Sequence, residues 1–145
     1  GAAIAVGTTI LDLHAEYRYR GLELRGLWAR AELEDVARLN AALGYQDGAS
    51  VGEVLEGAYL QAGFDVLAGG GSSALTPYLR WERVNTQEEV PAGFGTNPAN
   101  DQKHLTLGLA YQPLAQLIFK GEYVNVDNRA GTGVDRFNLS LGYIF

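Results

Sequence analysis

Cysteine and methionine are absent from this chain of 145 residues, and proline occurs only four times. Without cysteine the chain can form neither disulfides nor thiolate metal sites. No apolar run approaches the ~18 residues that a membrane-spanning helix needs. The formal net charge of −6 argues against nucleic acid as a partner, because phosphate binding needs clustered lysine and arginine. Residues 1–7 lack the basic segment of a signal peptide and are too few for one, which indicates a mature protein or a fragment.

Glycine and aromatic residues are plentiful instead. Nineteen glycines exceed the usual share, and eight tyrosines and five phenylalanines favour β structure. Apolar and polar residues alternate with period two in seven segments, which is typical of strands. The segments cover about residues 8–19, 22–32, 53–67, 74–86, 103–112, 115–127 and 137–145. Pro77 lies inside one of them and predicts a bulge or a weakened ladder there.

The last segment is the most informative one. Its apolar face carries Phe137, Leu139, Leu141, Tyr143 and Phe145, and its other face is mostly small or polar. A transmembrane β-strand turns its apolar side to lipid and its small and polar side to the lumen, with aromatic residues at the interface. The pattern therefore predicts an all-β fold, an antiparallel transmembrane β-barrel. Tyr143 and Phe145 are expected to belong to its C-terminal assembly signal.

The connections between the segments alternate in length. Those at about residues 20–21, 68–73 and 113–114 are short, and those at about 33–52, 87–102 and 128–134 are longer. Outer-membrane barrels have short periplasmic turns and longer extracellular loops, so we expect the C-terminus on the periplasmic side.

The first long connection is rich in helix formers over residues 33–43. Glu34 and Arg38 have the spacing of a helical ion pair, and Gly44 suits a C-cap. We expect a short helix that either narrows the pore mouth or is an exposed loop without a role in flux.

The odd number of segments limits the architecture. Seven antiparallel strands cannot close alone, because the first and the last run in parallel, and bacterial single-chain barrels have even strand numbers. We therefore expect residues 1–145 to form the C-terminal part of one larger barrel domain, with no second domain.

Three stretches resemble the phosphate-selective porin O/P family. The first is residues 74–87, ALTPYLRWERVNTQ, and the second is residues 57–64, GAYLQAGF. The third combines residues 105–111, LTLGLAY, with residues 119–123, FKGEY. The resemblance implies a trimeric porin of about sixteen strands in the outer membrane of a Gram-negative bacterium.

The alternation assigns residues to the two sides of the wall. The lumen is expected to be lined by His14, Arg18, Arg25, Arg80, Glu82, Lys120, Glu122 and Arg136. Lipid is expected to be faced by Leu105, Leu107, Leu109, Tyr111, Phe119, Tyr123, Phe137, Leu139 and Leu141. Arg80 and Glu82 are neighbours on one face and are expected to form an ion pair. The same spacing predicts a pair of Lys120 and Glu122, so the wall would carry paired charges rather than a free basic track.

No motif in the sequence predicts catalysis or a cofactor. His14 and His104 are too isolated for a zinc pair, and no serine, histidine and aspartate set forms a triad. Glu88 and Glu89 lie in a predicted loop, where solvated carboxylates are the simplest interpretation. We expect neither an enzyme nor a metal or cofactor site.

Three functions stay open at this point. The leading hypothesis is passive diffusion of small hydrophilic solutes or ions, with anions such as phosphate as one option. An outer-membrane adhesin or structural anchor is the second, and a soluble ligand-binding barrel is the third. For an outer-membrane barrel, the expected partners are outer-membrane lipid and lipopolysaccharide, the outer-membrane assembly machinery and two further copies in a homotrimer.

Overall fold

The computed structural model describes residues 4–144 as one antiparallel sheet of seven strands. The sheet is a meander in which each strand pairs with its neighbours in the sequence. Its strands are β1 (Thr8–Tyr19), β2 (Leu22–Leu33), β3 (Val54–Phe64), β4 (Ala74–Glu89), β5 (Asp101–Leu114), β6 (Leu117–Asn128) and β7 (Arg136–Tyr143). One helix, α1 (Val36–Leu43), and two short 3₁₀ turns, η1 (Asp47–Ala49) and η2 (Pro98–Asn100), lie in the connections. The all-β antiparallel prediction is confirmed.

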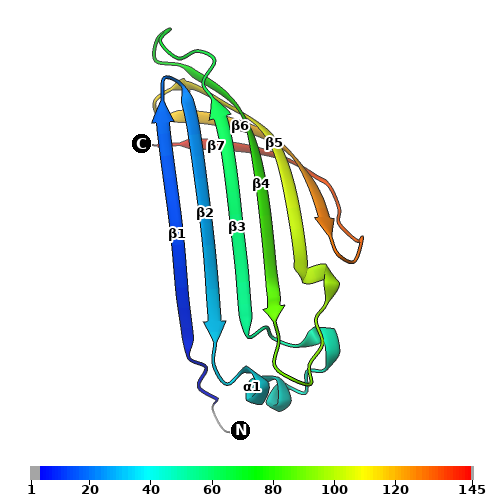
Figure 1. Cartoon of the computed structure of the whole chain (residues 1–145). Helices are drawn as coiled ribbons and strands as arrows, with labels where there is room; N and C mark the ends of the chain where they lie inside the picture. The colour runs from blue at the N-terminus through cyan, green and yellow to red at the C-terminus, as the bar shows by residue number, and fades with distance from the viewer. Residues whose placement is uncertain (1–3, 145) are drawn as a thin grey trace.

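The sheet curls strongly but stays open. In Figure 1, β6 and β7 pass behind the upper ends of β1–β3. Within residues 4–144 no pairing joins β1 to β7, so both strands are free edges. A transmembrane barrel and its total size therefore stay predictions. None of the helices in the described part of the chain is long and apolar enough to cross a membrane.

The connections sort to two ends of the sheet, which we call the turn end and the loop end (Figure 1). At the turn end, Arg20 and Gly21 join β1 to β2 with φ angles of 47° and 87°. Two residues with positive φ form the type I′ turn, whose twist matches that of a hairpin. The loop end carries α1 and the connections that follow β4 and β6.

A buried polar network holds the loop end together. The side chain of Asn40, on α1, is fully buried, donates to the Val51 carbonyl at 3.1 Å and accepts from the Val51 amide at 2.8 Å. Gln87, on β4, donates to the carbonyls of Gly48 and Ser50 and accepts from the Asn97 amide at 2.7 Å. The network therefore ties the β2–β3 connection to β4 and to the β4–β5 connection.

Helix α1 begins later than the sequence predicts. Leu33 still pairs with Thr8 in the sheet, and Asp35 has a φ angle of 56°, which a helix does not allow. Glu34 therefore lies outside the helix and cannot form the predicted helical pair with Arg38. The predicted C-cap is confirmed, because Gly44 has a φ angle of 67° and its amide donates to a carbonyl of the last turn.

Two strand boundaries also differ from the prediction. Strand β3 ends at Phe64 because the Asp65 carboxylate accepts from the amides of Leu67 at 3.0 Å and Leu75 at 2.9 Å. Strand β4 continues to Glu89, whose carbonyl accepts from the Glu53 amide at 2.8 Å. The prediction that Glu88 and Glu89 lie in a loop is therefore wrong.

The predicted disturbance at Pro77 is only partly correct. The register between β4 and β5 passes Pro77 without a shift. The ladder between β3 and β4 ends at the Gly63–Tyr78 pair, so Pro77, the neighbour of Tyr78 on β4, lies just outside this ladder. A missing amide donor is tolerated at the end of a ladder, so no bulge is needed there.

Candidate functional site: the polar face of the sheet

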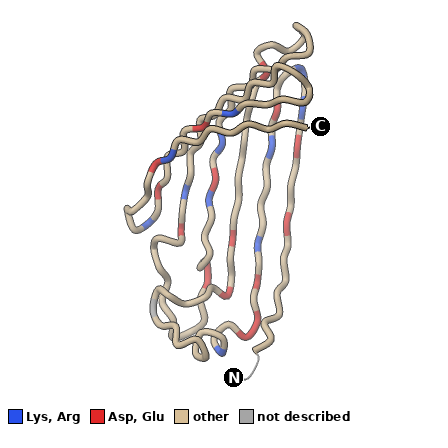
Figure 2. The backbone as a smooth tube through the Cα atoms, turned by 180° about the vertical axis from the view of Figure 1, so that it is seen from behind, with Lys and Arg blue, Asp and Glu red and all other residues tan. Residues whose placement is uncertain are grey.

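Strand register divides the side chains between two faces. Residues directly opposite each other in an antiparallel ladder point to the same side. One row across the sheet reads Arg18, Glu23, Gly63, Tyr78, Gly108, Glu122 and Asn138. We call the side with this row the polar face. All eight residues that the sequence analysis placed in the lumen lie on it, distributed over β1, β2, β4, β6 and β7. Figure 2 shows charges of both signs along the strands.

The opposite side is the apolar face. A row across its middle reads Tyr17, Leu24, Ala62, Leu79, Leu107, Tyr123 and Phe137. The nine residues that the sequence analysis turned toward lipid all lie here. They are strongly exposed, up to 77% for Leu139. Tyr143 also lies on this face, 64% exposed, and Phe145 lies outside the described residues.

Charged residues occupy the apolar face only toward the loop end. Arg30 pairs there with Glu32 at 2.9 Å, and Arg83 Nε pairs with Asp101 at 3.1 Å. Tyr123 lies near this border, and its hydroxyl donates to Asp135 at 2.5 Å. The apolar face is therefore a band with a polar border on one side.

The polar face carries a network of ion pairs on β1 and β2. Arg18 pairs with Glu16 at 2.5 Å and with Glu23 at 2.8 Å. Arg25 also pairs with Glu23, at 2.6 Å. These pairs are open to water to different degrees, and ion pairs that water reaches contribute little stability, so their main effect is to fix the positions of the charges.

The pairing on β4 follows the prediction, and the pairing on β6 does not. Arg80 Nε lies 3.1 Å from a carboxylate oxygen of Glu82, as predicted. Glu122, however, accepts a hydrogen bond of 2.5 Å from the hydroxyl of Tyr78, two strands away. The predicted pair of Lys120 and Glu122 is wrong, because the described residues place no carboxylate within ion-pair distance of Lys120.

Tyr78 reaches Glu122 by lying across β5 at Gly108. A Cβ atom at Gly108 would lie 2.1 Å from Cζ of the Tyr78 ring. The ring is 9% exposed, although it stands on the polar face. Reasoning from the sequence missed this residue. The available signal was a tyrosine aligned with glycines on both neighbouring strands, but it needs the strand register to be seen.

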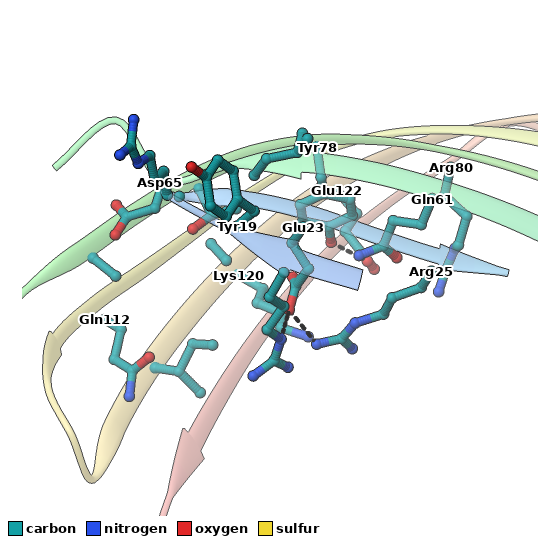
Figure 3. Close-up of a pocket in the computed structure, with 18 residues that line it drawn as sticks. Tyr19, Glu23, Arg25, Gln61, Asp65, Tyr78, Arg80, Gln112, Lys120 and Glu122 are labelled. Carbon is teal, nitrogen blue, oxygen red and sulfur yellow. Dashed lines mark hydrogen bonds and ion pairs between the residues drawn. The ribbon is translucent and has the colours of Figure 1, made fainter. Parts of the chain in front are cut away.

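A hollow of about 590 Å³ opens on the polar face at the turn end. Its lining comes from β1 to β6, which makes the polar face the concave side of the curled sheet (Figure 3). Its charged residues are Arg18, Arg20, Glu23, Arg25, Asp65, Arg80, Lys120 and Glu122. Five cations face three carboxylates, so the hollow is locally positive in a chain with a net charge of −6.

The remaining predicted residues lie apart from the hollow. His14 lies 3.6 Å from Asp12, and Arg136 stands opposite Val124 at the start of β7. His104 contacts Gln102 at 3.2 Å. In residues 4–144 no three side chains of histidine, aspartate or glutamate are grouped to hold a metal ion. Comparisons with known protein families, curated proteins and solved structures found no match.

Proposed function

We propose that this chain forms part of the wall of an outer-membrane porin, a water-filled channel for passive diffusion of small hydrophilic solutes or ions. The observation that carries the proposal is the division of one curled sheet into an apolar convex face and a charged concave face. In water, the apolar face would leave large side chains exposed, from 40% for Leu24 to 77% for Leu139. Monomeric soluble proteins rarely expose so large a contiguous apolar surface, whereas lipid would cover it at no cost.

The charged face supports a wet interior. Charges on a lipid-facing wall are costly, and residues within a membrane protein that carry charge line water-filled space or pair with one another. Arginine, lysine and glutamate occupy the concave face on β1, β2, β4 and β6. A small closed barrel would fill its interior with side chains, whereas a wide one leaves room for water.

The free edges support a larger barrel. Strands β1 and β7 run in the same direction because five strands separate them in an antiparallel meander. Antiparallel closure therefore needs an odd number of further strands between β7 and β1, which gives an even total. We propose that the same polypeptide supplies them, and the family resemblance implies about sixteen strands and a trimer. The turn end would face the periplasm and α1 the exterior.

Conductance of the full-length protein in planar lipid bilayers tests the proposal. We expect stepwise ohmic currents, and a folded state that requires detergent or lipid. A protein that inserts and folds but never conducts would favour the alternative, an outer-membrane adhesin or structural anchor. A monomer that stays folded and soluble without detergent would overturn both.

A further inference from the structure

We infer that Tyr78 sets how charge is arranged in the hollow by holding Glu122, which leaves Lys120 without a carboxylate partner among the described residues and facing water. Tyr78 is thus a positioning residue, and Lys120 is the residue that solutes would meet. The part of this inference that concerns ion preference rests on the proposed porin function. The part that concerns whether Lys120 has a carboxylate partner does not rest on it.

Sequence neighbours alone would give a different pairing. Lys120 and Glu122 are two positions apart on one strand face, about 6.6 to 6.8 Å along the strand, which their side chains can span. Arg80 with Glu82, and Arg25 with Glu23, have the same spacing and do pair, at 3.1 and 2.6 Å. Lys120 differs because its neighbour accepts a hydrogen bond from Tyr78.

Lys120 finds no other partner in the part of the chain that the structure describes. Its cross-strand neighbours are Ala110 on β5 and Ser140 on β7, which are small and uncharged. Its side chain is exposed and lines the hollow together with Arg80 and Arg25 (Figure 3). Because the Glu122 carboxylate is held by Tyr78, the Lys120 ammonium stands in the hollow without a direct ion pair among the described residues.

The reach of Tyr78 depends on Gly108. The ring crosses β5 where Gly108 has no side chain, and the hydroxyl arrives 2.5 Å from a carboxylate oxygen of Glu122. Three strands therefore cooperate: β4 supplies the ring, β5 the gap and β6 the acid. Removing only the hydroxyl should keep the ring in place and release the carboxylate toward Lys120.

The composition of the chain provides a direct assay. Lys103 and Lys120 are the only lysines in the sequence, and register places Lys103 on the apolar face near the loop end. Brief acylation of the folded protein in detergent, followed by peptide mass spectrometry, gives the labelling of Lys120 relative to Lys103. Only the neutral amine reacts, and a carboxylate partner raises a lysine pKa.

In Tyr78→Phe we expect the relative labelling of Lys120 to fall about threefold or more, because a carboxylate partner keeps the amine protonated. The control is Tyr59→Phe, which removes a hydroxyl from another tyrosine of the polar face and should change nothing. In a Glu122→Gln background, Tyr78→Phe should have no effect, because the released partner is gone. An unchanged ratio in Tyr78→Phe, or an equal fall in the Glu122→Gln background, would overturn the inference.

Conductance separates this inference from the proposed function. In a conducting channel, Tyr78→Phe should move the reversal potential at low salt toward cations, and Tyr59→Phe should not. If no variant conducts, the porin proposal fails while the labelling still decides the state of Lys120. A labelling change without a change in reversal potential would confine Lys120 to a structural role and overturn its contact with solutes.

Discussion

At the scale of single residues, glycines are as important to the polar face as its large side chains, because they leave space for them. Gly108 is the clearest case. A methyl group there would displace the Tyr78 ring, since its position lies 2.1 Å from Cζ. Overpacking of this kind usually costs about 1–3 kcal/mol.

We therefore expect Gly108→Ala to lower the free energy of unfolding by about 1–3 kcal/mol, measured by denaturant titration in detergent or lipid. Gly121→Ala is the matched control, because a Cβ there would meet Leu139 Cδ2 at an ordinary 3.6 Å. Equal losses for the two variants would show that Tyr78 does not lie where we place it.

Adjacent residues of one strand test the assignment of the two faces. Leu139 lies on the apolar face and Ser140 on the polar face of β7. Leu139→Arg should cost about 2–4 kcal/mol if the site lies near the bilayer midplane, whereas Ser140→Arg should cost far less. Reversible folding into liposomes measures both. Similar costs for the pair would contradict a lipid-facing apolar face.

At the scale of elements, the loop end is a fixed structure. Helix α1 is short, so its stability comes from packing rather than from propensity. The Asn40 side chain forms hydrogen bonds with both the amide and the carbonyl of Val51, in the β2–β3 connection.

Asn40→Ala should therefore speed hydrogen exchange in α1 and in the Val51 segment, since it leaves two half-buried backbone groups of Val51 without their partner, at a cost of about 1–3 kcal/mol each at most. Arg38→Ala, an exposed change on the same helix, serves as the control. If both variants exchange like the parent protein, the network does not hold the helix.

The β6–β7 connection is held by hydrogen bonds to one carboxylate, that of Asp135. Outside the strands, the Asp135 carboxylate accepts from the Tyr123 hydroxyl at 2.5 Å, the Val126 amide at 3.0 Å and the Asn125 amide group at 2.9 Å. These hydrogen bonds, the one from Tyr123 first, hold the pKa of Asp135 below its usual 3.8.

A carboxyl whose pKa is lowered by folding stabilises the folded state above its unfolded pKa, and this stabilisation is lost as the pH falls through the folded value. We expect hydrogen exchange in the β6–β7 connection, corrected for intrinsic rates, to rise as the pH falls below about 3.8. Asp135→Asn should remove this pH dependence. A connection equally protected at all pH values in the parent protein would refute the assignment.

At the scale of the whole molecule, the locally positive hollow sits in an acidic chain. Its charges stand at the turn end, which in the proposed porin is the side where solutes would pass to the periplasm. Replacing Arg80 and Lys120 together with glutamate should move the reversal potential toward cations.

The shift should shrink at high salt, because exposed charges are screened within about 3 Å at 1 M. Arg30→Glu with Arg83→Glu is a charge-matched control, since both arginines lie on the apolar face. The same shift in the control would mean that net charge, and not the hollow, sets ion preference.

The strands and their two faces could be predicted from the amino-acid sequence. A period of two assigns each side chain to a side as soon as a strand forms, which is why the seven segments agree with the register, as do the face residues that were predicted within residues 4–144. Local chemistry also predicted the Arg20–Gly21 turn, the Gly44 cap and the Arg80–Glu82 pair, because each involves residues next to one another in the chain.

Features that need residues from different strands became visible only in the folded chain. The Tyr78–Glu122 bond joins β4 to β6 across Gly108, and no sequence spacing reveals an alignment set by two successive registers. Helix α1 begins late because Leu33 pairs with Thr8, and β3 ends early because Asp65 binds an amide ten residues away. The curl of the sheet, which brings β1, β2 and β6 around one hollow, also depends on several strands. It accumulates from strand to strand, so no short stretch of sequence predicts it.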